Sequence, residues 1–466
     1  MGYAFVVCKR GETSRGGRIR SQVGEERNRN GMINVWKEFI KARTPFQLIA
    51  LGFAVVILLG TVLLLLPVSV RDNATVSVID ALFTSTSAVC VTGLIAIDTA
   101  DHFTVFGRTV VALLIQVGGL GVTSVGVGFI LAAGGRVSFK GRLLVREALN
   151  MDTSKGIIRL VEKILFMTLL FEGVGTFLCF FVFVQDYPPL TALGISLFHS
   201  VAAFNNSGFD ILGGLRNLIP YQTNVMLNLV TAGLIIFGGL GFLVILDIVK
   251  CRCFKKLTLH SKAVLVTSGI LLVVGTVALK LSEDITWLGA FFQSVSARTA
   301  GFSTYPIGTF TDVGLFILII LMFIGASPGS TGGGIKTSTM FVLLQAVKSV
   351  ATNQHCTAFK RKLPKDVIDK AFVVLFLSLS VVCVGTLVLC VLEPEYSFLQ
   401  LWFEEVSAFG TVGLSMGITP DLGVAAKLVV IITMFTGRLG ALTIASVWLF
   451  KEPAKAVYTE EGITIG

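Results

Sequence analysis

The chain has 466 residues, of which 54% are hydrophobic and only 14% are charged, and its mean hydropathy is +0.84. A soluble protein of this length needs more polar surface, so the composition indicates an integral membrane protein. The net charge of +10 does not indicate nucleic-acid binding, because the basic residues cluster between apolar segments, where they set membrane topology.

The first part of the chain differs from the rest. Residues 1–44 are rich in Arg, Gly, Glu and Asn and lack apolar periodicity, which predicts a disordered, basic cytoplasmic leader. This leader has no apolar region of the kind found in secretory signal peptides. Later apolar segments are long enough, or nearly so, to cross about 30 Å of hydrocarbon as helices. Those segments are Phe46–Val68, Lys163–Val184, Val264–Lys280 and Val373–Val391.

Four internal repeats contain these segments. Four stretches align without gaps, each with Phe, then Gly ten positions later, then Leu or Phe: Phe83–Leu94, Phe198–Phe209, Phe291–Phe302 and Phe403–Leu414. The residue five before each Gly is small: Ala88, Ala203, Ser296 and Ala408. A second alignment follows at Gly118–Gly121, Gly238–Gly241, Gly325–Gly329 and Gly437–Gly440. The repeats therefore cover residues 45–135, 158–250, 262–350 and 366–450, followed by a cytoplasmic tail at 451–466.

The hairpins determine the predicted fold class. The run before each aligned Gly is long enough for a short helix but not for a crossing, so it must enter the membrane and return to the same side. The sequence thus predicts an all-α polytopic membrane protein with eight spans and four re-entrant pore hairpins around a pseudo-fourfold pore. Four basic clusters predict cytoplasmic segments and place both termini in the cytoplasm of a plasma-membrane protein. They are Lys9–Arg43, Arg136–Lys163, Lys250–Lys262 and Lys348–Lys370.

The hairpin ends are the candidate ion-binding residues. Irregular backbone is tolerated in a membrane only where it lines a wet cavity, so the four ends are expected to meet around water. Glycine can turn its carbonyl toward such an axis, and rings of backbone carbonyls select K⁺. We expect filter carbonyls that bind K⁺ from Val91, Thr92, Gly93, Asn206, Ser207, Gly208, Thr299, Ala300, Gly301, Thr411, Val412 and Gly413. No ring of carboxylates suited to Ca²⁺ is present, since Glu404 and Glu405 occur in one repeat and are as well suited to stabilising its outer loop.

The third repeat is interrupted by a glycine-rich segment, Gly325–Thr337. Its five glycines and one proline are incompatible with a regular helix. One interpretation is an ordinary loop between two spans. The other is a flexible intramembrane gate below the filter, which is favoured because each half alone is too short to cross. The gate would include Gly325, Ser327, Pro328, Gly329, Gly332, Gly333, Gly334 and Lys336.

Arg438 is a further predicted gate residue. It lies in the apolar run Leu428–Phe450, at the position of Gly119, Gly239 or Ala326 in the other repeats. A charge inside the membrane is costly and usually faces a cavity or a partner. Snorkelling to an interface is the alternative, but roughly a dozen residues separate Arg438 from either end of that run. We expect Arg438 to project into the cytoplasmic half of the pore as an electrostatic barrier.

The four glycine-terminated hairpins, the Gly325–Thr337 segment and Arg438 together resemble the Trk/Ktr/HKT superfamily of K⁺ transporters, over about residues 45–466. Among its branches the chain is most similar to KtrB, the membrane subunit of bacterial Ktr systems. Gly93 differs from the Ser that marks Na⁺-selective plant members. The resemblance implies K⁺ uptake that depends on Na⁺ as an activating ion, a homodimer with one pore per subunit, and a cytosolic KtrA-like ring that binds ATP or ADP and controls the gate.

Other functions fit the sequence less well. A secondary transporter of a different solute also uses repeats and broken helices, and it remains the alternative. An intramembrane enzyme is disfavoured because no metal-ligand pair or nucleophile–base motif occurs within the apolar segments. We therefore expect no enzymatic activity and no organic cofactor, with K⁺ as the substrate and membrane lipid as the surroundings.

Overall fold

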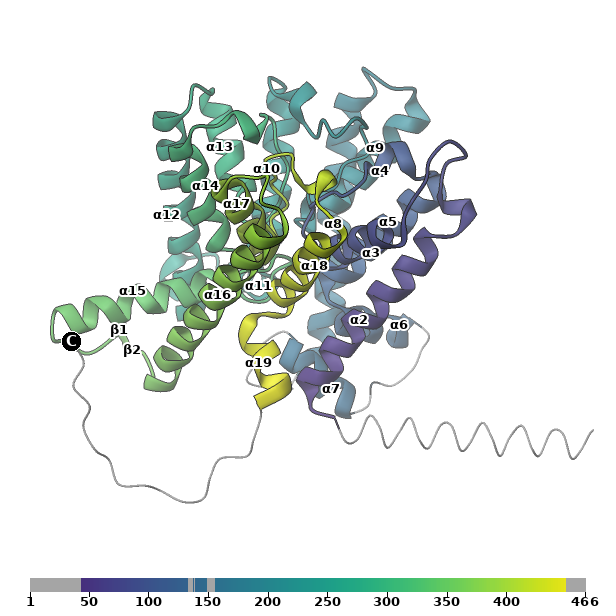
Figure 1. Cartoon of the computed structure of the whole chain (residues 1–466). Coiled ribbons are helices and arrows are strands. Elements are labelled where there is room, and N and C mark those ends of the chain that lie inside the picture. The colour runs from purple at the N-terminus through teal and green to yellow at the C-terminus, as the bar shows by residue number, and fades with distance from the viewer. Residues whose placement is uncertain (1–42, 133–136, 138, 149–155, 450–466) are drawn as a thin grey trace, which may run out of the picture.

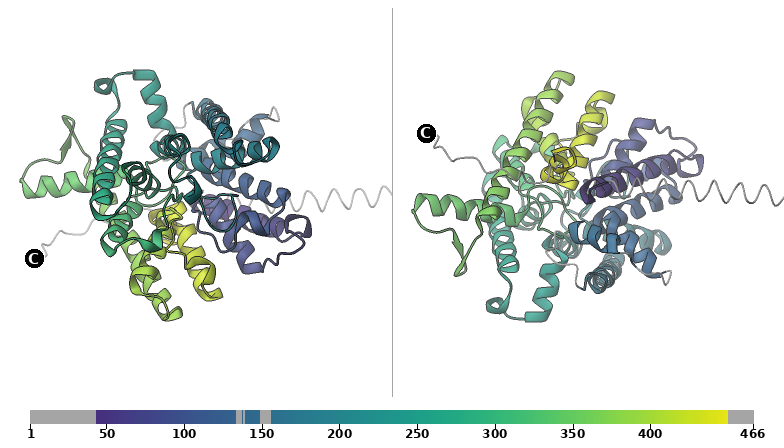
Figure 2. Two further views of the ribbon diagram at one scale, coloured as in Figure 1. Left: turned by 90° about the horizontal axis from the view of Figure 1, so that it is seen from above. Right: turned by 90° about the horizontal axis from the view of Figure 1, so that it is seen from below.

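The computed structural model describes residues 43–132, 137, 139–148 and 156–449. Helices dominate these residues, and their strands form one short antiparallel hairpin, β1 (Thr357–Ala358) with β2 (Arg361–Lys362). The helices surround a central region of irregular backbone, and the chain passes around this centre in sequence order (Figures 1 and 2). The predicted all-α fold class is confirmed. The predicted leader up to residue 42 and the tail from residue 451 lie outside the described residues.

Each repeat begins with a long helix that is apolar enough to cross a membrane: α2 (Pro45–Leu64), α8 (Ile157–Phe183), α12 (Leu259–Ser282) and α16 (Lys365–Leu392). Helix α2 starts where it does because Thr44 and Gln47 form a capping box before Pro45. Its outer face leaves Leu58, Leu59 and Val62 about 60% exposed. An apolar face of this kind suits contact with lipid, so the four predicted first spans are confirmed.

A short helix follows in every repeat: α3 (Val78–Val89), α9 (Pro189–Phe204), α13 (Trp287–Ser296) and α17 (Phe398–Gly410). With 10 to 16 residues, these helices are too short to cross the membrane. Each packs closely on the long helix before it, because a glycine of the long helix leaves room for a side chain of the short one. In three repeats that side chain is a serine whose hydroxyl donates to a main-chain carbonyl of the long helix. The pairs are Ser85 with Ile57, Ser200 with Glu172, and Ser294 with Leu272.

The second apolar helix is broken in every repeat, whereas the sequence analysis expected a break only in the third. Helix α5 (Val105–Leu120) meets α6 (Val122–Ala132) at 99°, and α10 (Val225–Leu240) meets α11 (Phe242–Cys251) at 95°. In the fourth repeat α18 (Val424–Leu439) ends one residue before α19 (Ala441–Leu449) begins. The cause is the last glycine of the second alignment, which has a φ that ends a regular helix: +81° at Gly121, +91° at Gly241 and +89° at Gly440.

In the third repeat the break is longer. Helix α14 (Asp312–Phe323) is separated from α15 (Thr337–Ala351) by the glycine-rich segment. Helix α15 leaves the bundle sideways, and packs with the β-hairpin and α16 around Val342, Leu343 and Ala371 (Figure 1). Among the described residues four helices have the length and apolarity of a membrane span, or six when each bent pair is counted as one. The remaining elements are α4 (Thr99–His102), α7 (Phe139–Ala148), η1 (Pro67–Ser69), η2 (Ile219–Tyr221), η3 (Phe254–Lys256), η4 (Ile307–Thr309) and η5 (Thr419–Asp421).

An ion pair joins the first repeat to the fourth. Lys427 of α18 donates to Asp80 in the first turn of α3 at 2.9 Å, and the two side chains are only 10% and 16% exposed. Removal of one partner leaves a poorly solvated charge, which typically costs about 3 kcal/mol or more. We expect Lys427→Met to lower the free energy of unfolding by about 3 kcal/mol, measured by denaturant unfolding in detergent.

The charge-swapped variant Asp80→Lys/Lys427→Asp should regain most of that loss. Asp72→Asn is the matched control, since Asp72 is exposed and lies a few residues before α3. The free energies of unfolding of Asp80→Lys and Lys427→Asp would be measured separately as well. If their two losses of stability simply added up in the double variant, the ion pair would not link the two repeats.

Candidate functional site

The four aligned glycines lie together at the centre of the bundle. All have positive φ: +92° at Gly93, +67° at Gly208, +75° at Gly301 and +93° at Gly413. A Cβ built on any of them would collide with the backbone carbonyl of the next repeat, and in the fourth repeat with that of the first. The colliding pairs are Gly93 with Ser207, Gly208 with Ala300, Gly301 with Val412, and Gly413 with Thr92. The four hairpin ends therefore form a closed ring in sequence order, called the glycine ring below.

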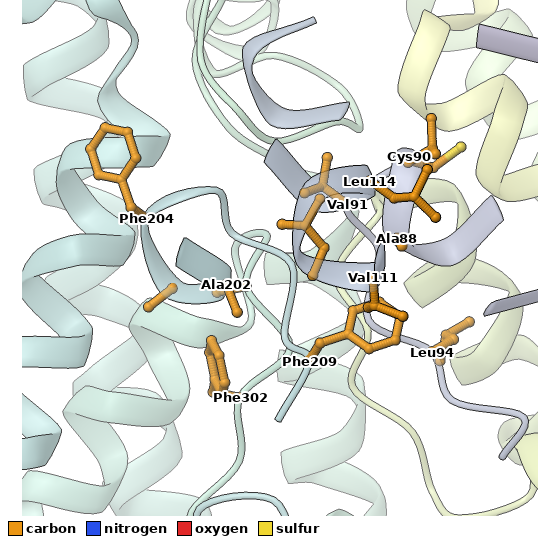
Figure 3. Close-up of a cluster of buried hydrophobic side chains, with 14 of the residues drawn as sticks. Ala88, Cys90, Val91, Leu94, Val111, Leu114, Ala202, Phe204, Phe209 and Phe302 are labelled. Atoms are coloured by element: carbon orange, nitrogen blue, oxygen red, sulfur yellow. The ribbon is translucent and has the colours of Figure 1, made fainter. Parts of the chain in front are cut away.

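The residue after each ring glycine anchors the ring in the core. Leu94, Phe209 and Phe302 are completely buried, and Leu414 is 2% exposed. Figure 3 shows Leu94, Phe209 and Phe302, from three different repeats, within one cluster of buried side chains. This packing explains why the sequence keeps a large apolar residue after each glycine, since it holds the irregular backbone in one position.

The residues that precede the ring glycines are also buried, with exposures of 1% or less for the side chains of the predicted filter residues other than glycine. Val91, Asn206 and Thr411 each have a left-handed backbone, with φ of +55°, +57° and +49°. That conformation is costly for β-branched residues, and it persists only where the surrounding structure imposes it. Asn206 and Thr299 also share a side-chain hydrogen bond of 2.8 Å between the second and third repeats.

The hydrogen bonds around the ring correct the gapless alignment of the third repeat. Ser87 Oγ accepts from Gly93 N at 3.0 Å and donates to Leu94 O at 2.8 Å, and Ser407 Oγ accepts from Gly413 N at 3.0 Å. Both serines lie six residues before their glycine. Ser296 donates to Phe302 O in the same way but lies five residues before Gly301. The third repeat is therefore one residue shorter here, and Thr299 has no left-handed φ.

The glycine-rich segment Gly325–Thr337, called the inner loop below, lies against the side of the ring on which α5, α10 and α18 end. Its ends are joined by a bridge between Ile324 and Ile335. The loop donates from Ser327 N to Gly239 O at 3.1 Å and from Gly333 N to Thr411 Oγ1 at 2.9 Å. It therefore contacts the bend of the second repeat and the ring segment of the fourth. None of its residues is exposed, so it is not an ordinary surface loop.

The other predicted gate residues of the inner loop contact either the loop itself or the neighbouring helices. Lys336 Nζ donates to Gly332 O at 2.7 Å, which holds the tip of the loop against its own backbone. Gly325 packs directly on Gly333, and Gly334 packs on Gly410 of α17. On the opposite side, Gly329 O accepts from Phe242 N at 3.0 Å, and Pro328 O lies beside Gly241.

Arg438 bridges three repeats at this loop. Its guanidinium donates to the carbonyls of Thr331 in the inner loop and Gly118 in α5, and to Gly119 O at 3.2 Å. The sequence analysis placed Arg438 in the middle of a continuous span, and this placement is wrong. It lies one residue before the end of α18, because Gly440 ends the helix there. The carbonyls at the end of α5 favour a cation, since they carry the negative end of the helix dipole.

Glu404 and Glu405 have different environments despite their adjacency. Glu404 accepts from Met416 N at 3.0 Å and Thr419 Oγ1 at 2.9 Å, so it ties the chain that follows the fourth ring glycine to α17. This agrees with the stabilising role considered from the sequence. Glu405 accepts from Thr433 Oγ1 at 2.7 Å and takes the place that serine has in the other three short helices.

The residues that hold the site together could not all be predicted from the sequence. The three ring serines and the acceptor carbonyls of Gly118 and Thr331 were not among the predicted site residues. The sequence does contain one signal for the ring serines, because a serine comes immediately before the small residue in the first and fourth repeats, as Ser87 before Ala88 and Ser407 before Ala408. The carbonyl acceptors had none, because main-chain groups carry no residue-specific signal.

A substitution at Gly93 tests the ring directly. Gly93→Ser adds a Cβ that must displace the Ser207 carbonyl in a backbone conformation unfavourable to serine. We expect Na⁺ discrimination to fall about tenfold or more, which corresponds to a loss of only about 1.4 kcal/mol in relative binding. The measurement is Rb⁺ uptake into liposomes with Na⁺ as competitor. Gly194→Ala is the control, since a Cβ there meets nothing within 4 Å. Unchanged Na⁺ exclusion in Gly93→Ser would remove Gly93 from the site.

Comparisons with known proteins agree with this architecture. Residues 31–267 and 262–457 match the sequence model of the TrkH family, described as cation transport protein. The chain is 38% identical over 453 residues to the potassium/sodium uptake protein NtpJ of Enterococcus hirae, covering 93% of this chain and 100% of that protein. It is also 38% identical over 437 residues to the Ktr system potassium uptake protein B of Bacillus subtilis, covering 91% and 97%.

A solved structure shares the fold. The crystal structure of the potassium transporter TrkH from Vibrio parahaemolyticus superimposes with a TM-score of 0.70 at 20% identity, covering 87% of this chain and 86% of that one. The resemblance found in the sequence is thus confirmed. The glycine ring, the fourfold repeat and the extent of the similarity lead to one conclusion: the chain belongs to the TrkH family of cation transport proteins, which are multi-pass membrane transporters and not enzymes.

Proposed function

We propose that the protein takes up K⁺ through the glycine ring and acts as the ion-translocating subunit of a Ktr-type system. The observation that carries the proposal is the closed ring of four glycines, in which backbone of each repeat meets that of the next. Such a ring offers carbonyl oxygens in place of water to a dehydrated cation. The four short helices point their C-terminal ends, which are the negative ends of the helix dipoles, toward the same centre, and this favours a cation over an anion. The potassium uptake named for two similar proteins supports K⁺ as the ion.

The inner loop and Arg438 are the proposed gate. The bridge from Arg438 to Thr331 and Gly118 places a fixed positive charge and a segment of backbone next to the ring. A cation leaving the ring on this side would meet both, and the charge would repel it in a medium of low dielectric constant. Transport then requires the loop to move, which its five glycines permit at low cost.

Regulation and coupling complete the proposal. The name of one similar protein, Ktr system potassium uptake protein B, supports a system with more than one subunit. In this proposal the chain forms a homodimer with one pore per subunit and binds a cytosolic KtrA-like ring. Binding of ATP or ADP to that ring would control the inner loop, and Na⁺ would activate uptake. Helix α15 is well placed to carry such a signal, because it continues directly from the inner loop and extends out of the bundle. Both termini would lie in the cytoplasm.

Rb⁺ uptake by the purified full-length protein in liposomes tests this function. We expect Rb⁺ uptake that K⁺ inhibits more strongly than Na⁺ does, and no uptake of organic solutes. A secondary transporter of a different solute would give the reverse pattern. Absence of Rb⁺ flux in both Arg438→Ala and the parent protein, with and without Na⁺, would contradict an ion pore.

A further inference from the structure

Glu172 is a carboxylate in the middle of a membrane-spanning helix, at the sixteenth of the 27 residues of α8. It is only 6% exposed, and neither of the ion pairs found among the described residues includes it. An ionised carboxylate in such a place is expensive unless a positive charge accompanies it. The pore mechanism proposed above makes no use of this residue.

The fold does not require an acid at this position. Ser200 donates to the backbone carbonyl of Glu172, just as the equivalent serines donate to Ile57 in the first repeat and Leu272 in the third. Three of the four repeats thus share one backbone contact, while two of them place an apolar side chain there. The carboxylate of Glu172 is therefore specific to the second repeat and needs a separate explanation.

The partners of Glu172 form a cluster with excess oxygen. Asn205 Nδ2 lies 2.8 Å from Gln116 Oε1, 3.0 Å from Glu172 Oε1 and 2.9 Å from Val201 O. An amide nitrogen has two hydrogens, so it cannot satisfy three acceptors fully. The other amide atom, Asn205 Oδ1, is buried and has no donor. Asn205 Oδ1 therefore has no donor, Gln116 Oε1 and Glu172 Oε1 share the hydrogens of one amide nitrogen, and no cationic side chain pairs with the carboxylate among the described residues.

The cluster lies where its occupancy can influence transport. Asn205 directly precedes the ring segment Asn206–Gly208 and caps the negative end of α9. Gln116 lies in the last turns of α5, two residues before Gly118, whose carbonyl accepts from Arg438. The site therefore touches one element that leads into the ring and one that holds the gate.

From this geometry we infer that Gln116, Glu172 and Asn205 bind an alkali-metal cation at the junction of the first and second repeats, separate from the ions in the ring. Rotation of the Asn205 amide would bring Oδ1 toward the cation beside the oxygens of Gln116 and Glu172, and the cation would neutralise the carboxylate. Hard oxygen ligands with one net negative charge suit Na⁺ or K⁺. Binding of the cation does not depend on the proposed function. Only the role of the bound cation, which would be to stabilise the junction between ring and gate, rests on that function.

Cation binding can be measured without transport. Thermal unfolding of the full-length protein in lipid nanodiscs would be followed at constant ionic strength, with NaCl or KCl replacing choline chloride. We expect Na⁺ to raise the Tm of the parent protein. In Glu172→Gln the midpoint of the Na⁺ titration should move at least tenfold upward or disappear, and in Gln116→Leu it should move severalfold. Glu162→Gln, an exposed position on the same helix, should behave as the parent.

The K⁺ titration separates the two cations. If the site takes K⁺, Glu172→Gln should lose one of two K⁺-dependent phases and keep the one that belongs to the ring. The inference is overturned if both titrations of Glu172→Gln match the parent. It is equally overturned if the two proteins differ only in their pH dependence in choline chloride, since Glu172 would then bind a proton. Rb⁺ uptake by the parent protein tests the pore independently, so the two failures are distinguishable.

Discussion

Arg438→Ala is expected to increase the maximal Rb⁺ flux about tenfold or more while leaving the apparent K⁺ affinity little changed. The substitution removes a guanidinium that donates to Thr331, Gly118 and Gly119 and so connects the inner loop to two other repeats. A hydrogen bond to a charged group contributes about 1.5–3 kcal/mol. A tenfold change in the population of the open state corresponds to about 1.4 kcal/mol, so the loss of one such bond is enough for the expected rise in flux. Affinity should persist because the ring is not altered. Initial rates of Rb⁺ uptake in liposomes provide the measurement.

Arg438→Lys distinguishes two explanations of the barrier. It keeps the charge but loses the fork that reaches several carbonyls at once. An electrostatic barrier predicts parent-like flux in Arg438→Lys, whereas a hydrogen-bonded plug predicts a flux close to that of Arg438→Ala. The contacts of Arg438 favour the plug, since its hydrogen bonds reach two different repeats. Arg159→Ala, an exposed position on α8, controls for the loss of a positive charge. Unchanged flux in a well-folded Arg438→Ala would leave gating to the inner loop alone.

Shortening the inner loop should produce the second large effect. Deletion of part of Ser327–Gly333 removes the contacts to Gly239 and Thr411 that hold the loop against the ring. Obstruction is then lost while the ring remains, so we expect flux to rise by about tenfold and dependence on a cytosolic regulator to fall. The measurement is Rb⁺ uptake with and without that regulator. Normal or lower flux in a folded deletion variant would contradict a gate.

Two further variants show whether loop and arginine act together. Lys336→Met keeps the loop length but removes the hydrogen bond from Lys336 Nζ to Gly332 O. The Rb⁺ flux of this variant should therefore lie between those of the parent and the deletion variant. Combining the deletion with Arg438→Ala should give no more flux than either change alone, because both break the same contact. Fully multiplicative effects would mean that Arg438 and the loop form separate barriers.

The repeats were recognisable from the sequence because their physical requirements are local. A glycine with positive φ, a large buried residue after it and a run too short to cross the membrane all leave a pattern in neighbouring residues. The sequence therefore predicts that the ring residues and the inner loop lie near one another. The length of the third hairpin was misjudged, because the missing residue before Gly301 is visible only when Ser296 is found in the position of Ser87 and Ser407.

The sequence by itself determined the membrane class, the four repeats, the ring glycines and the isolation of Arg438 in an apolar run. Only the tertiary structure decided where that arginine acts and which groups it meets. Its acceptors are backbone carbonyls of Thr331, Gly118 and Gly119, separated from it by about a hundred residues or more. Every residue has such a carbonyl, so no sequence pattern marks these acceptors. The bends at Gly121, Gly241 and Gly440 expose them, and the packing of the four repeats around one centre brings them to Arg438.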